Sequence, residues 1–353
     1  MVDFSSNDYL GLSVHPEMRR RAADYAERFG VGNGASRLVT GDHPAFSEIE
    51  TKLARGKKAE AALILSSGFQ TNATVLGALM DKTTLEAEPI LFADRLNHAS
   101  LIQGALASGA RQVRFRHNDL DHLESLLAKH QGEGRFLFIA TETVFSMDGD
   151  RADLPRLEKL AEKYSAFLYL DDAHATGVLG PDGFGLGSGL IGPNCMVMGT
   201  FSKALGGFGS YVACTGTLRD YLINRCPGLI YSTALPPAVL GAMDAALDLV
   251  SAMESERALI QSCAESFRRA LRGAGLDIGA SSSQIVPVIL GDSRKALAIS
   301  RNLEREGFLG MAIRPPTVPP GKARIRFAFS ARHRQEDALA LAEAIIRLTE
   351  EIT

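Results

Sequence analysis

The sequence has 353 residues but no tryptophan, only four cysteines and a formal net charge of only −3. The near-neutral charge gives no reason to expect nucleic acid or an anionic membrane surface as a partner. The cysteines show no CxxC or CxxH spacing, and some of them stand in apolar runs. This pattern predicts buried free thiols in a reducing compartment and argues against a disulfide framework or a zinc site, so no metal is expected. The cysteines are Cys195, Cys214, Cys226 and Cys263.

Long apolar runs are also missing. No run approaches the roughly 18 residues that a membrane-spanning helix requires. The N-terminal sequence MVDFSSNDYLG lacks the layout of a signal peptide, and the chain contains no internal repeat or low-complexity segment. With 46% hydrophobic and 22% charged residues, the composition is ordinary for a globular protein. We therefore expect a cytoplasmic protein that does not bind a membrane and is long enough for two domains.

The chain does contain a regular alternation of short apolar runs and helical patterns, and several of the runs end in polar residues. This alternation predicts a doubly wound α/β fold with buried parallel strands. The expected strands are residues 61–65, 89–93, 111–115, 136–140, 167–170, 196–198 and 211–214. The expected helices are residues 16–29, 44–55, 70–80, 101–108, 120–129 and 155–164.

The last third of the chain follows a different pattern. A helical pattern starts at Pro236-Pro237 and continues with few breaks to residue 273. The order of the remaining elements predicts a smaller α+β domain. Its expected parts are a strand at 286–290, a helix at 294–306, a proline-rich turn at 314–320, a strand at 324–330 and a helix at 334–350.

Residues 166–207 concentrate side chains that can carry chemistry. The two apolar runs in this stretch end in polar residues, namely Asp171, Asp172 and His174 after the first and Thr200, Ser202 and Lys203 after the second. In an open α/β sheet, the carboxyl ends of neighbouring parallel strands face one crevice, where ligands bind. Two acids, an imidazole and a lysine should therefore converge on one small volume.

Two other segments could serve a ligand. Residues 66–69, Ser-Ser-Gly-Phe, connect an expected strand to an expected helix, and the unpaired N–H groups of a helix N-terminus can hold an anion. No GK[ST] follows, so this turn is not a P-loop, and a turn of this kind can also bind nothing. The glycine-rich residues 30–37 form a loop that either lets the backbone approach a ligand closely or serves only as a flexible connector.

Lys203 gives these features a common interpretation. Most lysines are solvated surface charges, but this one follows an apolar strand and precedes a glycine-rich turn. A partly buried lysine has a lowered pKa and can form a Schiff base. Together with an anion cradle in the same sheet, this chemistry suggests pyridoxal 5′-phosphate (PLP). The cofactor's ring nitrogen needs a carboxylate, for which Asp171 is the candidate. His174 could bind the phenolic oxygen, and His98 could stack on the ring.

Several segments then carry a family resemblance: FSSNDYLGL, DRLNHASL, TETVFSMDGD, LDDAHATGVLG, GTFSKALGG, IYSTALPPA and AIRPPTVPPGKARIR. In this order and spacing they resemble the α-oxoamine synthases, PLP enzymes of the aspartate-aminotransferase fold type, over essentially the whole chain. The resemblance implies a fold-type I architecture, with a mostly parallel, seven-stranded central sheet, helices on both faces and a smaller C-terminal α+β domain. It implies an N-terminal segment at 1–14, a large PLP-binding domain at 15–254 and a small domain at 255–353.

The resemblance also implies an activity, a PLP-dependent decarboxylating condensation of an amino acid with an acyl thioester. The run AIRPPTVPPG favours members that use L-alanine and a pimeloyl thioester, carried by CoA or by a carrier protein, over glycine-using relatives. A homodimer with shared active sites is expected. Relatives carry a longer segment before FSSNDYLG, so we expect a shortened N-terminus, which leaves the acyl selectivity open.

Individual residues receive roles from the same resemblance. Lys203 would attach the cofactor and later transfer protons. Asp171 would pair with the ring nitrogen, His174 would reach the phenolic oxygen, and His98 would stack on the ring. Further cofactor contacts are expected from Ser67, Gly68, Phe69, Ser146, Thr200, Ser202 and, in the other subunit's site, Thr233. Substrate contacts are expected from Asn7 and Arg326 at the amino-acid carboxylate and from Arg314 at the acyl chain.

Two alternatives stay open at this point. A relative could condense glycine or serine with a different acyl thioester. A protein of this fold could instead be catalytically idle and bind a partner or an acyl carrier. The complete set of Lys203, Asp171, His98 and His174 argues against the idle protein, because a scaffold without chemistry has no need of all of them.

Overall fold

The computed structural model describes residues 1–352, and the chain forms two compact units. The larger unit consists of Leu12–Thr143 and Ala152–Ala252, and the smaller consists of Met1–Gly11, Val144–Arg151 and Met253–Thr353. The assignment of a PLP-binding domain and a small domain stays a prediction. The two units differ from the predicted domains because Met1–Gly11 and Val144–Arg151 belong to the smaller unit together with the C-terminal part of the chain.

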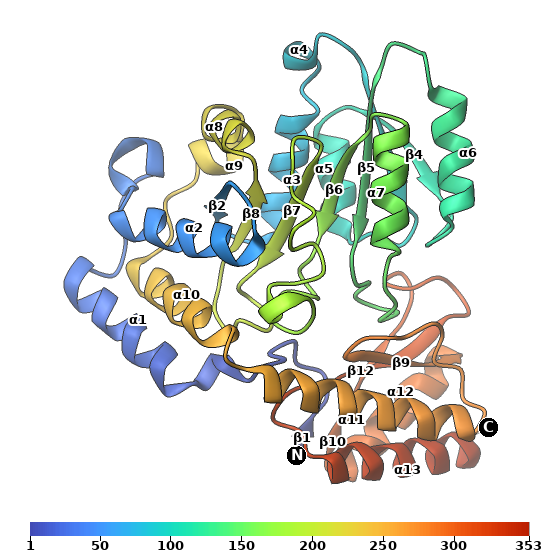
Figure 1. Cartoon of the computed structure of the whole chain (residues 1–353). Helices are drawn as coiled ribbons and strands as arrows, with labels where there is room; N and C mark the ends of the chain where they lie inside the picture. The colour runs from blue at the N-terminus through green and yellow to red at the C-terminus, as the bar shows by residue number, and fades with distance from the viewer. Residues whose placement is uncertain (353) are drawn as a thin grey trace. The chain divides into compact units, whose positions relative to one another are not determined.

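The larger unit contains a seven-stranded sheet (Figure 1). Its strands are β2 (Ala61–Leu65), β3 (Pro89–Asp94), β4 (Arg111–Phe115), β5 (Phe136–Glu142), β6 (Phe167–Asp171), β7 (Cys195–Thr200) and β8 (Ser210–Cys214). They lie in the order β2-β8-β7-β6-β5-β3-β4. Only β8 runs antiparallel to its neighbours, and all other pairs are parallel. The predicted mostly parallel α/β sheet is therefore confirmed.

Side chains that alternate along these strands form two hydrophobic clusters, because successive residues of a strand point to opposite faces. In β3, Leu91 belongs to one cluster, whereas Ile90 and Phe92 belong to the other. The first cluster includes residues of α3 (Gly68–Leu79), α5 (Ala99–Ala107), α8 (Gly216–Arg225) and α9 (Pro227–Ile230). The second includes residues of α6 (Leu120–His130) and α7 (Leu154–Lys163). Helices therefore cover both faces.

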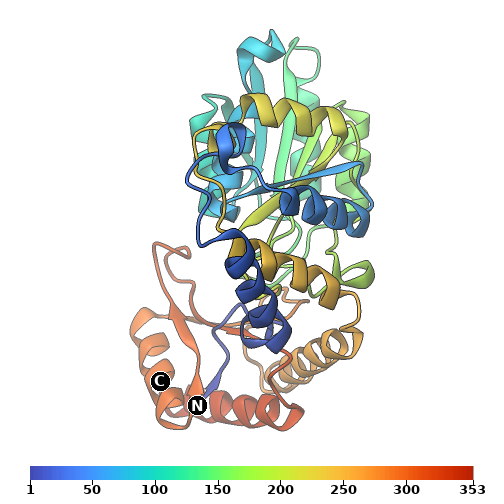
Figure 2. The same cartoon turned by 90° about the vertical axis from the view of Figure 1, so that its left-hand side faces the viewer.

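The larger unit also contains α1 (Pro16–Phe29), α2 (Pro44–Lys57), α10 (Pro237–Val250) and the short elements α4 (Lys82–Leu85), η1 (Leu12–Val14), η2 (Arg37–Gly41) and η3 (Pro181–Gly183). Helix α1 packs against α10 (Figures 1 and 2), and α2 packs against β2 and β8. Asp244 of α10 pairs with Arg21 of α1 at 2.7 Å and with Lys52 of α2 at 2.6 Å, so one carboxylate joins three helices.

The smaller unit combines short strands with three helices, as the α+β pattern predicted. Its elements are β1 (Val2–Asp3), β9 (Ile285–Gly291), β10 (Phe308–Leu309), β11 (Met311–Ile313), β12 (Ala323–Ala328), α11 (Glu254–Gly273), α12 (Ser293–Arg305) and α13 (Gln335–Glu351). Strands β11, β12 and β9 form an antiparallel sheet, and β1 pairs with β10 in parallel. Phe4 and Phe267 pack on Phe329, with ring centroids 5.4 and 5.2 Å away, and this contact ties the N-terminal segment to the unit's core.

The structure adds two features that the sequence pattern does not specify. The helical pattern that runs to residue 273 is two helices, α10 and α11, which belong to different units. Met253 between them has a non-helical backbone, and the acidic first turn of α11 favours a new helix N-terminus there. The N-terminal segment contains the short strand β1, which no local pattern predicts, because its partner strand lies about 300 residues away.

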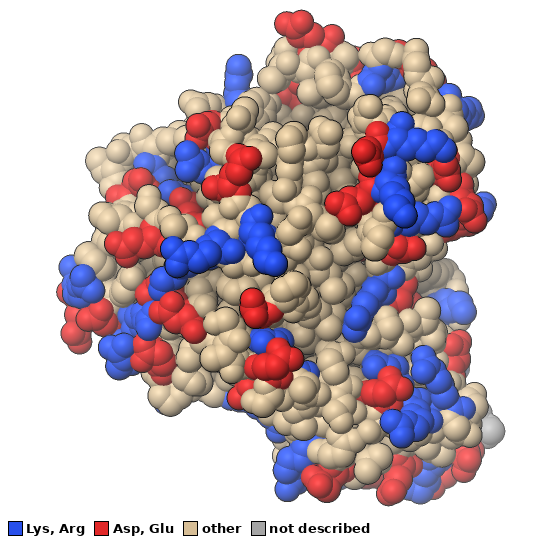
Figure 3. All heavy atoms as spheres, in the orientation of Figure 1, with Lys and Arg blue, Asp and Glu red and all other residues tan. Residues whose placement is uncertain are grey.

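In the part of the chain that the structure describes, no helix is both long and apolar enough to cross a membrane. Acidic and basic side chains are interspersed over the face seen in Figure 3, without an extended area of one sign. This distribution agrees with the small net charge of −3.

Candidate active site

One pocket of the larger unit lies at the carboxyl ends of β6 and β7 and the N-terminus of α3. The two strands are parallel neighbours, with Asp171 opposite Met198. Most of the predicted cofactor residues line this cavity of about 220 Å³: Ser67, Gly68, Phe69, His98, Asp171, His174, Thr200, Ser202 and Lys203. The structure thus brings the expected acid, imidazoles and lysine together.

Lys203 and His174 contact each other directly, with 2.8 Å between Nζ and Nε2. Each residue lies in the turn that follows its strand, and these turns approach closely. A Cβ on Gly177, whose φ is +90°, would lie 2.4 Å from the Cβ of Ala204, so only glycine fits there. A hydrogen bond between an amine and an imidazole requires a lone pair on one of them. The pair can therefore pass a proton between the two nitrogens.

Asp171 is the acid that faces the pocket. It is nearly buried, and its Oδ2 accepts a hydrogen bond from Asn72 Nδ2 at 2.7 Å while its Oδ1 accepts one from the Ala173 N–H at 3.0 Å. Asp172 has different partners: its oxygens accept hydrogen bonds from Lys57 Nζ and Thr143 Oγ1, each at 2.6 Å. Of the two adjacent acids, only Asp171 lines the cavity.

His98 caps the N-terminus of α5 and lines the pocket. Its Nδ1 lies 2.7 Å from Ser100 Oγ and accepts the Ser100 N–H at 3.2 Å. Its backbone N–H donates to Glu142 Oε1 at 2.6 Å. Burial lowers the pKa of His98; the negative charge of Asp171 opposes this shift, and the positive charge of Lys203 adds to it.

The N-terminus of α3 supplies groups that suit an anion. Ser67 caps the helix by accepting the Gln70 N–H at 3.3 Å, and the N–H groups of the first turn have no partner within the helix. A Cβ on Gly68 would lie 3.0 Å from Met198 Cε, so glycine lets this turn sit against β7. The hydroxyls of Thr200 and Ser202 are 2.8 Å apart at the end of β7. Helix N–H groups and hydroxyls together form an anion cradle.

The polar groups of this pocket match the individual parts of PLP. The Lys203 amine suits an aldehyde, the Asp171 carboxylate suits a ring nitrogen that must stay protonated, and the cradle at α3 suits a phosphate. His174, in contact with the amine, is placed to bind an oxygen next to the aldehyde. Each of these groups therefore has the charge or the hydrogen-bonding capacity that its expected partner on the cofactor requires.

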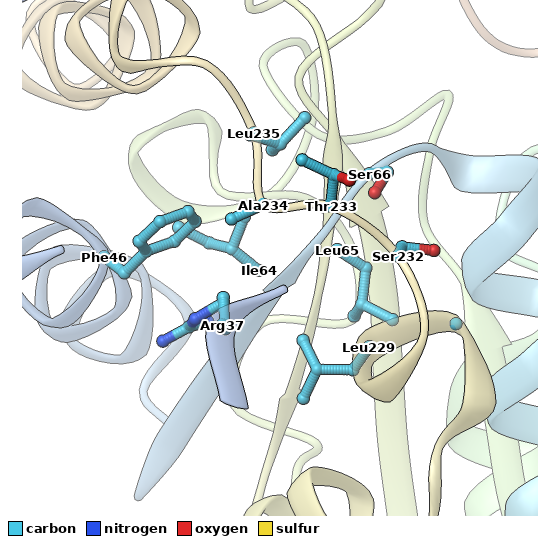
Figure 4. Close-up of a pocket in the computed structure, with 11 residues that line it drawn as sticks. Arg37, Phe46, Ile64, Leu65, Ser66, Leu229, Ser232, Thr233, Ala234 and Leu235 are labelled. Atoms are coloured by element: carbon cyan, nitrogen blue, oxygen red, sulfur yellow. The ribbon is translucent and has the colours of Figure 1, made fainter. Parts of the chain in front are cut away.

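Thr233 does not line this pocket. It lines a separate cavity of about 20 Å³, together with Arg37, Ser66 and Ser232 among others (Figure 4). Such a volume holds about one water molecule and cannot hold a cofactor. Thr233 is therefore not among the residues that line the pocket with the other predicted phosphate contacts.

The remaining predicted residues belong to the smaller unit. Three of them form one cluster: Arg326 donates from Nε to the Ser146 carbonyl oxygen at 2.5 Å and from Nη2 to Asn7 Oδ1 at 3.0 Å. Tyr9 joins this cluster by donating its hydroxyl proton to Asn7 Oδ1 at 3.1 Å. Arg314 is exposed in the proline-rich turn between β11 and β12.

The sequence analysis missed three polar residues that line the pocket: Asn72, Ser100 and Glu142. A signal existed for Glu142, because it ends an apolar strand in register with Asp171. Asn72 lies one helical turn after Gly68, and Ser100 follows His98 in the first turn of α5, so both lie near residues that were singled out. Polar residues this deep in helices need partners, which the sequence alone does not identify.

Comparison with known proteins identifies the family. The aminotransferase class I and II family matches residues 1–345. A relative from Paramagnetospirillum magneticum, described as a putative 8-amino-7-oxononanoate synthase, is 58% identical over 350 residues, which cover 99% of this chain and 89% of the relative. The chain therefore belongs to the aminotransferase class I and II family and, within it, to the α-oxoamine synthases.

Solved structures agree with this assignment. A serine palmitoyltransferase variant from S. paucimobilis, with a bound PLP–myriocin aldimine, has a TM-score of 0.93 at 25% identity and covers 99% of this chain and 87% of its own. An 8-amino-7-oxononanoate synthase from Francisella tularensis has a TM-score of 0.85 at 27% identity and covers 99% of this chain and 98% of its own. The fold is therefore that of fold-type I enzymes, as the sequence predicted.

Proposed function

We propose that this enzyme makes 8-amino-7-oxononanoate, for biotin biosynthesis, by PLP-dependent condensation of L-alanine with a pimeloyl thioester, with release of carbon dioxide and the free thiol. The observation that supports this most strongly is the pocket in which Lys203, His174, Asp171 and His98 meet. Relatives that are 46% to 58% identical over most of the chain carry the name of this activity. The enzyme is a PLP-dependent acyltransferase.

PLP supplies an electron sink that stabilises negative charge on the amino acid's Cα. In our proposal Lys203 holds the cofactor through Nζ, and Asp171 keeps the ring nitrogen protonated through its carboxylate. His174 binds the phenolic oxygen, and the first turn of α3, with Thr200 and Ser202, holds the phosphate. Ser146 contacts the phenolic oxygen or the substrate.

The protein's own residues then handle protons and charge. Lys203 Nζ would remove the Cα proton as the base, and its 2.8 Å contact with His174 Nε2 would allow that proton to pass to the imidazole. His98 donates a hydrogen bond to the oxygen that becomes negative when the thioester carbonyl is attacked. Lys203 returns a proton to the carbon after carbon dioxide has left.

Substrate recognition belongs to the same proposal. Arg326, with Asn7, binds the carboxylate of alanine, because the planar guanidinium matches a carboxylate with two parallel hydrogen bonds. Nη2 of Arg326 now donates to Asn7 Oδ1, an uncharged acceptor that a carboxylate can replace. Arg314, exposed in its turn, contacts the acyl chain.

We further propose a cytoplasmic homodimer in which Thr233 reaches the phosphate held by the partner subunit. Exposed apolar side chains near the glycine-rich loop and Thr233 support a subunit interface: Val31 is 86% exposed, Val39 74% and Tyr231 83%. Apolar residues gathered in this way are typical of interaction surfaces. Size determination in solution, with and without Val31→Asp, tests the dimer.

The substrate assignment is tested with PLP-loaded enzyme and three amino acids. Alanine, glycine and serine are each supplied with pimeloyl-CoA and with the pimeloyl carrier-protein thioester, and the products are identified by mass spectrometry. We expect 8-amino-7-oxononanoate from alanine and little product from the other two amino acids. Efficient condensation of glycine or serine, with none from alanine, would identify a different α-oxoamine synthase.

A further inference from the structure

Asn72 connects three elements beside the pocket. From α3, its Nδ2 lies 2.7 Å from Asp171 Oδ2 on β6 and 2.9 Å from Ser100 Oγ on α5. Its Oδ1 accepts a hydrogen bond from the Tyr169 hydroxyl at 2.9 Å. Asn72, Ser100 and Tyr169 are at most 1% exposed. The NH₂ group and the oxygen of the amide therefore all have partners, and the side chains involved are almost entirely buried.

The partners of Asn72, Ser100 and His98 indicate which atom donates in each hydrogen bond of this network. The Asn72 amide turns its NH₂ group toward the Asp171 carboxyl oxygen, which accepts one hydrogen, and the second hydrogen of that group points to Ser100 Oγ. Because the Ser100 N–H also points at His98 Nδ1, this nitrogen offers a lone pair there, and the Ser100 hydroxyl, while it accepts from Asn72, donates its own proton to it across 2.7 Å. The Ser100 N–H donates to the same nitrogen at 3.2 Å.

We propose that Asn72 is a positioning residue that acts through Ser100: it fixes the serine hydroxyl as a donor to His98 Nδ1 and so holds His98 neutral, with its proton on Nε2. A protonated imidazole would carry a hydrogen on Nδ1, opposite two donors that already point there. The relay from Asn72 to Ser100 to His98 thus keeps Nε2–H available as a donor. Asn72 simultaneously holds Asp171, so one amide orients two groups of the site.

Other charges around His98 act in both directions. Glu142 accepts the His98 backbone N–H, Asp171 favours a charged ring, and Lys203 disfavours it. Burial also disfavours the charged ring. The relay adds a directional contribution that these charges do not supply, because it depends on which way the Ser100 hydroxyl points. Substitution of Ser100 or Asn72 can therefore separate the effect of the relay from the effect of these charges.

The use of the relay rests on the proposed function, in which His98 donates to an oxygen that becomes negative. A neutral histidine with its proton on Nε2 can donate this hydrogen bond throughout the pH range in which Lys203 must act as a base. The relay therefore serves the step in which the thioester carbonyl is attacked.

The test is a titration of the histidines by NMR on the full chain labelled at histidine Cε1, with and without PLP and without substrate. The spectrum of His98→Gln assigns the His98 signal. The variants are Ser100→Ala, Asn72→Leu and the double variant, with Tyr169→Phe added to ask whether the Asp171 carboxylate alone can orient the amide. Thr71→Val is the matched control, because Thr71 is a buried neighbour in α3 that bonds to Ser210 instead.

We expect Ser100→Ala to raise the pKa of His98 by about one unit, since a donor to the neutral ring is lost. Asn72→Leu should raise it as well, and the double variant should raise it no further than Ser100→Ala alone. Tyr169→Phe and Thr71→Val should leave it unchanged. His15 and His43, whose Nδ1 atoms also accept a backbone N–H at a helix start, serve as internal controls and should not move.

The proposal is overturned if Ser100→Ala leaves the pKa of His98 unchanged, or if the shifts of the two single variants add in the double variant. Ser100→Ala removes only one oxygen, so it provides a decision even if Asn72→Leu fails to fold. The titration without PLP measures the effect of the relay on the pKa of His98 without any contribution from the cofactor. A chain that shows the relay but binds no PLP would instead contradict the proposed function.

Discussion

Lys57 Nζ lies 2.6 Å from Asp172 Oδ2, and neither side chain is exposed to solvent. The pair joins the C-terminal end of α2 to the turn after β6, directly beside Asp171. Gly185 covers it so closely that a Cβ there would lie 1.9 Å from the Asp172 oxygen. Burial lowers the pKa of Lys57, but the charge of Asp172 and its hydrogen bond outweigh this effect, so the pKa is raised and the lysine stays charged.

Removing one partner of this pair should destabilise the protein. We expect Lys57→Met to lower the free energy of unfolding by about 3–5 kcal/mol, because Asp172 is left as an uncompensated buried charge. Lys58→Met, at the exposed neighbouring position, is the control and should change it little. Urea denaturation followed by circular dichroism measures both. Equal stability of the two variants would show that Asp172 has another source of compensation.

The two adjacent acids should respond differently to the same substitution. Asp171→Asn should lower kcat/KM by about 10²-fold or more, because the charge beside the ring nitrogen is lost, with little change in thermal stability. Asp172→Asn should lower thermal stability and retain most of the activity, because its partner is Lys57 and not the cofactor. Steady-state kinetics and thermal unfolding on both variants separate the roles. If Asp172→Asn abolished activity and Asp171→Asn lowered only stability, Asp172 would be the acid that serves the cofactor.

The cysteines should be inert in the folded protein. All four are buried and free, and burial raises the pKa of Cys195 and of Cys214 to about 12. Almost no thiolate exists at pH 8, so reaction with Ellman's reagent should require unfolding. Because the folded-state pKa values lie above those of the unfolded chain, the free energy of unfolding should fall as the pH rises above about 9. Rapid native reaction at pH 8 would contradict this burial.

Local patterns in the sequence predict the elements of the larger unit well, because strand length and helical periodicity report burial directly. They also predict that Asp171 and Lys203 meet, since both follow buried strands and parallel neighbours end at one edge of a sheet. In the structure β6 and β7 are adjacent, and both residues line the same pocket. The short pairing of β1 with β10 has no such local pattern, and the sequence does not reveal it.

The polar contacts around the site were not predictable in the same way. Asn72 reaches Asp171 across 99 residues of chain, and Lys57 reaches Asp172 across 115. Which acid pairs with a buried lysine and which faces the pocket depends on how the helices are placed on the sheet. That placement results from packing over the whole unit, and the local sequence carries little of it.

The proposed attachment of PLP to Lys203 can be tested by borohydride reduction, which fixes the cofactor to the lysine that carries it. The PLP-loaded enzyme is reduced, digested and mapped by mass spectrometry, with Lys203→Ala as the control. We expect a phosphopyridoxyl group on the peptide that contains Lys203 and none on the corresponding peptide of the variant. A phosphopyridoxyl group on another lysine, or an unchanged modification in Lys203→Ala, would contradict it.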